Sequence, residues 1–184
     1  MLTREAQRAA GAIPTAEPFT RTTRTAMPAP PLRLGIACDV SGSMHPFTAH
    51  VASAAWILAH AAHHTHVPAD TATVIFGHHV HPVVHPGKAP ATVTEFAARD
   101  NFEAIDDAID ALDGALGLSR PEAARLLVIV SDGRYRAEPR KQGQRRIDRL
   151  RATRCAVLWL TPDTPSSDPL DGTTVHVMTD PAAA

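Results

Sequence analysis

Short apolar runs alternate with longer segments of helical periodicity from residue 32 of this 184-residue chain onward. Runs this short and this apolar are typical of strands buried on both faces of a parallel sheet. They occur at 32–38, 71–76, 126–130, 156–160 and 175–178, and apolar residues with helical spacing occupy 46–66, 102–116 and 138–152. The alternation predicts an α/β fold of the doubly wound, Rossmann-like kind, with a mostly parallel central sheet and helices on both faces.

An antiparallel strand is predicted at one edge of this sheet. Residues 80–84 follow the strand at 71–76 after a turn at Gly77, and they include Pro82. Proline has no backbone N–H to donate, so within sheets it is confined to edge strands. We therefore expect 80–84 to pair with 71–76 as a hairpin and to form the edge of the sheet.

The chain divides into an arm and one folded domain. Residues 1–31 are rich in Arg, Pro and Thr without a sustained period, so we expect an extended arm, the tail of an upstream region. Residues 32–184 hold all the predicted strands and helices. Because no helical segment follows the last predicted strand, we expect the helix that would cover it to be missing from this end.

Composition excludes several classes of function. The chain has 18 Lys and Arg against 19 Asp and Glu, and this balance removes the general electrostatic attraction on which nucleic-acid binders depend. No apolar stretch approaches the ~18–20 residues of a membrane-spanning helix, so we expect no membrane partner. Cys38 and Cys155 both lie inside apolar runs, which is typical of reduced core thiols in a cytosolic protein.

Two of the predicted strands end in acidic residues with small polar neighbours. Asp39-Val-Ser41-Gly-Ser43 comes directly after the first strand, and Asp132 comes directly after the run Leu-Leu-Val-Ile-Val. In an open doubly wound sheet, ligands bind outside the carboxyl ends of the strands, where the strand order reverses. If these two strands flank that point, two carboxylates and two hydroxyls meet in one crevice. A set made only of hard oxygen donors suits Mg²⁺ or Mn²⁺.

These residues resemble the motifs of a von Willebrand factor A (VWA) domain. The stretch 34–44 (LGIACDVSGSM) matches the D-x-S-x-S motif of that family, its metal-ion-dependent adhesion site (MIDAS). The S-D-G sequence at 131–133 matches its second acidic element, and the resemblance extends over 32–180 in the order of strands and helices. It implies a VWA fold with a divalent-metal site.

The resemblance also implies a role for each residue of the motif. Ser41 and Ser43 would contact the ion directly, and Asp39 and Asp132 would often act through water. The ion implied is Mg²⁺, with Mn²⁺ or Ca²⁺ as alternatives.

The third element of the family's site departs from its usual pattern here. The family has a Thr that opens a helix as G-T-N-x-x-x-A, and the comparable stretch of this chain begins Arg99-Asp100-Asn101. Asp100 takes the Thr position, with Asn101 as the other register. A third carboxylate would hold the ion more firmly without a partner, and it would make the ion a poorer electrophile for an acidic residue of another protein.

The Asp-Asn pair is more similar to the VWA domains of bacterial metal-chelatase subunits and their relatives, which work beside MoxR-type AAA+ ATPases. This resemblance implies a cytoplasmic, non-catalytic, Mg²⁺-dependent protein-interaction domain, an adaptor for such an ATPase or for a chelatase-like complex. His45 follows the metal motif directly, and Arg134 and Arg136 follow Asp132. We expect these three side chains to contact the partner.

Two other functions are weighed against this one. An Asp at a strand end beside Mg²⁺ can act as the nucleophile of a phosphoryl-transfer enzyme. Haloacid-dehalogenase-type enzymes place a second Asp two residues after the first, where this chain has Ser41, and the sequence has no Gly-rich phosphate loop. The other candidate is a histidine-based metal-binding protein, because histidines gather in two runs at positions 60, 63, 64 and 66 and at 78, 79, 81 and 85. Those histidines can equally decorate the surface.

Charge is unevenly distributed along the sequence. The stretch 134–154 holds nine of the 18 basic residues, and 95–113 holds seven of the 19 acidic ones. The basic stretch is either a docking face for an acidic partner or a solvated helix face.

Overall fold

The computed structural model describes residues 4–11, 29–88, 92–93, 96 and 102–178. The elements within these residues are α1 (Arg4–Ala9), β1 (Leu32–Asp39), a 3-10 helix (Gly42–Phe47), α2 (Thr48–His63), β2 (Ala69–Phe76), β3 (Val80–Val84), α3 (Ile105–Leu116), β4 (Ala124–Val130), α4 (Ala137–Ala152), β5 (Ala156–Pro162) and β6 (Thr174–Met178). They form the predicted α/β arrangement.

The sheet has six strands in the order β3-β2-β1-β4-β5-β6. Four of its neighbouring pairs are parallel, and β3 pairs antiparallel with β2, with Pro82 on this edge strand as predicted. From β1 the chain first builds outward through β2 and β3, and it then returns to the other side of β1 and builds outward through β4, β5 and β6. The strand order therefore reverses between β1 and β4, which confirms a doubly wound sheet and fixes its switch point.

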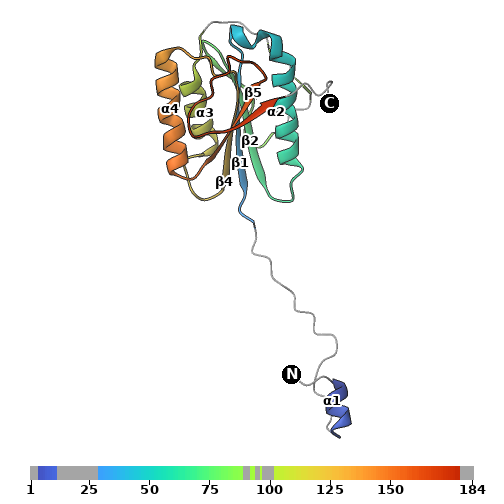
Figure 1. Cartoon of the computed structure of the whole chain (residues 1–184). Helices are drawn as coiled ribbons and strands as arrows, with labels where there is room; N and C mark the ends of the chain where they lie inside the picture. The colour runs from blue at the N-terminus through green and yellow to red at the C-terminus, as the bar shows by residue number, and fades with distance from the viewer. Residues whose placement is uncertain (1–3, 12–28, 89–91, 94–95, 97–101, 179–184) are drawn as a thin grey trace.

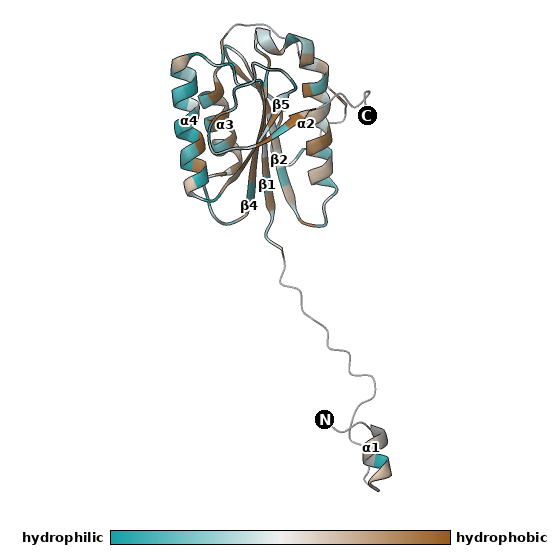
Figure 2. Cartoon of the chain, in the orientation of Figure 1, coloured by the Kyte–Doolittle hydropathy of each residue, from teal (hydrophilic) through white to brown (hydrophobic). Residues whose placement is uncertain are grey.

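Helices cover both faces of the sheet (Figure 1). Helix α2 lies over one face, in contact with β1 and β2, while α3 and α4 lie side by side over the other. Side chains of β1 alternate between the two cores: Ile36 and Cys38 pack on the α2 side, and Ala37 packs on the side of α3. Figure 2 shows the central strands β1 and β4 as mostly brown, apolar ribbons, whereas α4 is mostly teal. Each fully buried aliphatic side chain in these cores contributes about 1.5–3 kcal/mol to folding.

Two predicted helices start later than expected, and a short helix lies within the predicted arm. The segment predicted as one helix from residue 46 begins as a 3-10 helix that contains Pro46, and α2 starts only at Thr48. The helix predicted from residue 102 starts at Ile105, so Phe102 lies outside it. Residues 4–9 form α1 within the arm that we predict to be extended. Proline suits the first turn of an α-helix and of a 3-10 helix alike, so Pro46 did not indicate which of the two forms here.

The connection from β5 to β6 differs from the other parallel crossovers. A helix links β1 to β2, β2–β3 to β4, and β4 to β5, whereas 163–173 contains no helix. As a result, Val175 and Val177 of β6 are exposed. The prediction that a covering helix is missing concerns the chain after residue 178, outside the described residues, and it stays a prediction. Among the described residues, no helix has the length and apolar character needed to cross a membrane.

Candidate functional site

The predicted metal motif lies at the switch point of the sheet. Asp39 is the last residue of β1, and Ser131 and Asp132 directly follow β4. Cys38 pairs with Val130 in the register of these two strands, so the residues that follow them come out side by side. The hydroxyl of Ser131 donates a hydrogen bond of 2.5 Å to Asp39 Oδ2. The structure thus brings the two separated acidic motifs together, as the sequence predicts.

Asp39 is fully buried and both of its carboxylate oxygens accept hydrogen bonds. Oδ1 accepts from the backbone N–H of Ser41 at 2.8 Å, and Oδ2 accepts from Ser131. Burial is the main reason why the pKa of Asp39 is raised to about 6; the charge of Asp132 adds to the increase, and the bonds from Ser131 and Ser41 oppose it. A cation beside these carboxylates would stabilise their charged forms.

The two serines of the motif point their hydroxyls toward each other. Ser41 Oγ and Ser43 Oγ lie 3.3 Å apart, with Ser41 buried and Ser43 half-buried. The 3-10 helix begins between them, and the N–H of Met44 donates to the carbonyl of Ser41 at 3.0 Å. Met44 itself is fully buried, so it anchors the loop to the core on the α2 side. The loop therefore presents a pair of hydroxyl oxygens next to Asp39.

Asp132 is held in place by the turn that follows β4. Its Oδ1 accepts from the N–H of Arg134 at 3.1 Å, and its carbonyl accepts from the N–H of Asp168 at 2.7 Å. Gly133 between them has φ +75°, and a Cβ there would overlap the backbone carbonyl of Asp168. Only glycine fits this turn, because the residue needs both a left-handed conformation and the space of a missing side chain. Arg140 ties the loop of Asp168 down by donating to its carbonyl at 2.8 Å.

Ser131 is the residue of this site that the sequence analysis undervalued. Besides donating to Asp39, its hydroxyl accepts from the N–H of Gly133 and from the hydroxyl of Tyr135, both at 2.9 Å. Its carbonyl accepts from Trp159 Nε1 at 2.8 Å, so Trp159 has a polar contact in addition to its core packing. Ser131 stands within the S-D-G motif, but its link to Tyr135 depends on how the following turn folds back.

Glu103 is a second residue that the sequence analysis missed. It falls within the segment predicted as a helix, 102–116, whereas it precedes α3 and is buried, with the N–H of Arg136 3.4 Å from its Oε2. The guanidinium of Arg136 lies over the ring of Phe102 at 4.1 Å. Arg136, a predicted partner contact, is therefore engaged within the chain. The other two predicted contacts, His45 and Arg134, are exposed.

The fifth predicted ligand, Asp100, lies outside the described residues together with Asn101. The four other predicted ligands, Asp39, Ser41, Ser43 and Asp132, offer hydroxyl and carboxylate oxygens, and this donor chemistry fits a hard divalent cation such as Mg²⁺. The donor set of this site is thus consistent with the metal that the fold implies.

The histidine runs do not assemble into a metal site of their own. Within the described part of the chain, no group of three or more His, Cys, Asp or Glu side chains is placed to hold a metal ion. Neighbouring imidazoles pack on one another instead, as with His78 and His79, whose ring centroids lie 4.5 Å apart.

The uneven charge of the sequence is partly compensated between α3 and α4. Arg146 pairs with Asp110 at 3.1 Å, and Arg149 pairs with Asp110 and Asp113 at 2.8 and 3.3 Å. Arg140 pairs with Asp168 in the same way. The acidic and basic stretches therefore lie side by side, and several of the arginines expected on a docking face are engaged in ion pairs within the chain.

The whole sequence supports the resemblance that the site suggests. Residues 10–184 match the sequence model of a family described as "VWA domain containing CoxE-like protein". The chain belongs to this family. A search of curated proteins returned no match for it. VWA domains are generally interaction modules, and they are often metal-dependent.

Solved structures show the same fold. The manganese-loaded TRAP protein of Plasmodium vivax is 14% identical, with a TM-score of 0.57 over 71% of this chain and 56% of that one. A von Willebrand factor type A protein from Catenulispora acidiphila is 19% identical, with a TM-score of 0.59 over 84% and 40%. Proximal thread matrix protein 1 of the mussel byssus, with a zinc-occupied MIDAS motif, is 12% identical, with a TM-score of 0.56 over 81% and 42%. This CoxE-like chain thus spans about half the length of these proteins or less.

Proposed function

We propose that this CoxE-like chain is a non-catalytic protein-interaction domain that depends on a divalent metal ion. The ion is Mg²⁺, held directly by the hydroxyls of Ser41 and Ser43 and through water by the carboxylates of Asp39 and Asp132. Membership of the VWA family supports an interaction role. The manganese of the TRAP protein and the zinc in the MIDAS motif of the thread matrix protein support a divalent ion.

One observation carries the proposal. Asp39 is buried at the switch point with both oxygens bonded to protein donors, next to a pair of hydroxyls and a second carboxylate. Because donors of the chain itself hold these groups in place, binding an ion costs little reorganisation. The bonds to both oxygens of Asp39 also favour contact with the ion through water.

Asp100 supplies a third carboxylate in this proposal. With three carboxylates the site binds its ion without help from a partner's acidic side chain, and the ion attracts such a side chain weakly. The partner is then recognised by the rim of the site, where His45 and Arg134 are exposed. The ion keeps the rim in its binding geometry.

The partner that we propose is a MoxR-type AAA+ ATPase or a chelatase-like complex in the cytoplasm. The CoxE-like family assignment supports this branch of VWA domains. Cys38 and Cys155 are both buried and unbridged, which is consistent with a reducing compartment.

Affinity capture tests the proposal. The immobilised chain should retain a purified MoxR-type ATPase from the same organism in Mg²⁺ and release it in EDTA. Asp39→Ala should abolish capture under both conditions, because it removes the carboxylate at the centre of the site. The matched control is Asp163→Ala, which removes an exposed carboxylate from the loop after β5 and should behave as the unchanged chain.

Two outcomes would contradict the proposal. Capture that survives both EDTA and Asp39→Ala would show that the interaction does not use this site. Turnover of a phosphate ester that disappears in Asp39→Ala would show that the site is catalytic.

A further inference from the structure

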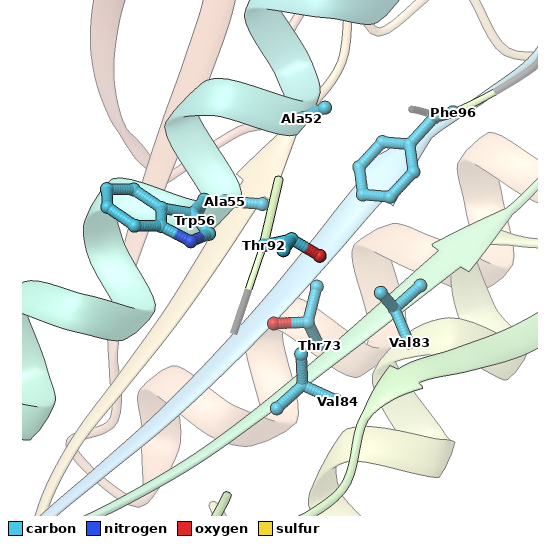
Figure 3. A pocket seen from close by; sticks show the side chains of 8 residues that line it. All are labelled: Ala52, Ala55, Trp56, Thr73, Val83, Val84, Thr92 and Phe96. Carbon is cyan, nitrogen blue, oxygen red and sulfur yellow. The ribbon is translucent and has the colours of Figure 1, made fainter. Parts of the chain in front are cut away.

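A small pocket lies between α2 and the β2–β3 edge of the sheet, three residues before the end of β2 (Figure 3). Its volume is about 20 Å³. Apolar side chains form most of its wall, and three residues contribute polar atoms; the full lining is Ala52, Ala55, Trp56, Thr73, Val83, Val84, Thr92 and Phe96. No charged side chain is among them, so the pocket differs in chemistry from the strand-end site.

Two buried polar atoms in this pocket have no hydrogen-bond partner. Among the described residues, Trp56 Nε1 and Thr73 Oγ1 are the buried side-chain nitrogen and oxygen atoms left unpaired. Thr73 is only 2% exposed. Figure 3 shows the indole nitrogen and the Thr73 oxygen turned toward the same space, whereas the hydroxyl of the neighbouring Thr92 points away from the indole. Buried polar groups without a partner are rare in folded proteins, because they lose their bonds to water and gain nothing in return.

We propose that this pocket binds one water molecule that bridges Trp56 and Thr73. The water oxygen accepts from the indole N–H, which is a donor only, and it exchanges a further hydrogen bond with the Thr73 hydroxyl. A bound water needs roughly 10–15 Å³ of cavity space and two to four polar partners. The pocket meets both requirements, since it offers about 20 Å³ and the polar atoms of Trp56 and Thr73.

Other occupants fit the pocket less well. An ion would be buried without a charged partner, which is strongly unfavourable. A purely apolar guest would leave the indole N–H and the Thr73 hydroxyl unpaired. Water satisfies both polar atoms and matches the available volume.

The water ties the middle of α2 to the middle of β2. Helix α2 starts directly after the 3-10 helix that contains Ser43. The proposed water therefore fixes the helix on which the predicted metal loop rests, from a position outside that loop.

A crystal structure tests this proposal most directly. We expect one ordered density peak at about 2.7–3.2 Å from both Trp56 Nε1 and Thr73 Oγ1 in the unchanged chain. In Thr73→Val, which keeps the shape of the side chain but removes the hydroxyl, this peak should be lost or displaced. A pocket without density, or one closed by a rearranged side chain, would overturn the proposal.

A solution measurement covers the case in which crystals of the variant are not obtained. The chain has two tryptophans, so a ¹⁵N spectrum shows two indole N–H signals. Thr73→Val should move the Trp56 signal and leave that of Trp159, which is bonded to Ser131. The matched control is Thr71→Val on the same strand, since Thr71 Oγ1 has its own partner in the carbonyl of Lys88 and lies outside the pocket. It should move neither signal. A Trp56 signal unchanged in Thr73→Val would count against a bridging water.

Discussion

The strand-end site and the pocket beneath α2 both bury polar side chains against the sheet, but they complete the hydrogen bonds of these groups in different ways. At the strand ends, Asp39 and Ser131 are bonded entirely by protein atoms. In the pocket, Trp56 Nε1 and Thr73 Oγ1 have no protein partner. A region whose polar atoms are already satisfied holds a fixed shape for an incoming ion, whereas one with unpaired atoms needs a bound molecule to complete it.

The difference follows from where each region lies. At the switch point, loops leave two adjacent strands, and one supplies the backbone N–H of Ser41 while the other supplies the hydroxyl of Ser131 to the carboxylate of Asp39. In the pocket, the polar atoms come from the middle of a helix and the middle of a strand, whose backbone groups are used in regular secondary structure. The following variants test how far this comparison holds.

The largest effect is expected for Gly133→Ala at the strand-end site. We expect the free energy of unfolding to fall by about 3 kcal/mol. The alanine would have to adopt the left-handed backbone conformation of Gly133, and its Cβ would overlap the backbone of Asp168. Urea denaturation measures the change. The control is Gly114→Ala in α3, where a Cβ meets nothing within 4 Å and alanine should stabilise the helix slightly. Equal stability of Gly133→Ala and the unchanged chain would mean that this turn is not fixed.

Asp39→Asn should change how stability depends on pH when EDTA removes metal. The pKa of Asp39 is raised to about 6, so the folded chain holds this proton more tightly than the unfolded chain does. Stability should therefore fall as pH rises from about 4 to 6, and the loss, on the order of 2–3 kcal/mol, persists above pH 6. The asparagine variant lacks this titration, so its stability should not fall between pH 4 and 6, although its amide nitrogen cannot accept one of the two hydrogen bonds that Asp39 accepts.

The matched control for that experiment is Asp163→Asn, an exposed carboxylate. Denaturation at several pH values should give it the same pH dependence as the unchanged chain. A pH dependence that is identical in Asp39→Asn and the unchanged chain would contradict the raised pKa.

Tyr135→Phe should have a smaller effect on the same site. The hydroxyl of Tyr135 donates to Ser131, which in turn donates to Asp39, so its loss loosens the carboxylate without removing a predicted ligand. We expect a loss of about 1 kcal/mol in stability. Affinity for Mn²⁺, measured by calorimetry, should fall about tenfold, the usual scale for residues that orient a ligand. Unchanged affinity would show that Tyr135 serves folding alone.

The smallest effect is expected for Thr73→Val in the pocket. If a water bridges Trp56 and Thr73, the variant loses a satisfied hydrogen bond and its stability falls by about 0.5–1 kcal/mol. If the pocket is dry, removing an unpaired hydroxyl stabilises the chain instead. The sign of the change in urea denaturation therefore separates the two cases.

Much of the fold could be predicted from the periodic spacing of apolar residues alone. The five parallel strands and the edge strand with Pro82 lie close to their predicted positions because their apolar runs admit few alternatives. The helix starts were less predictable. Pro46 suits both kinds of helix, and Phe102 has the spacing of α3 but stacks with Arg136 before that helix begins.

The candidate site was partly predictable for a similar reason. Asp39 and Asp132 were expected to meet because parallel strands end at one edge, and Ser131 is now seen to join them. The parts missed depend on tertiary contacts: the fold-back of Tyr135 onto Ser131, and the burial of Glu103 beside Arg136. No local pattern encodes such contacts. The ligand roles themselves, and that of Asp100, stay predictions.

A thermal shift with Mg²⁺ tests the central claim most directly. At pH 7.5, saturating Mg²⁺ should raise the melting temperature of the unchanged chain, because an ion that binds only the folded state stabilises it. Asp39→Ala should show no rise, and Asp163→Ala should show the full one. A melting temperature that does not respond to Mg²⁺, or an equal rise in Asp39→Ala, would contradict a metal site at the ends of β1 and β4.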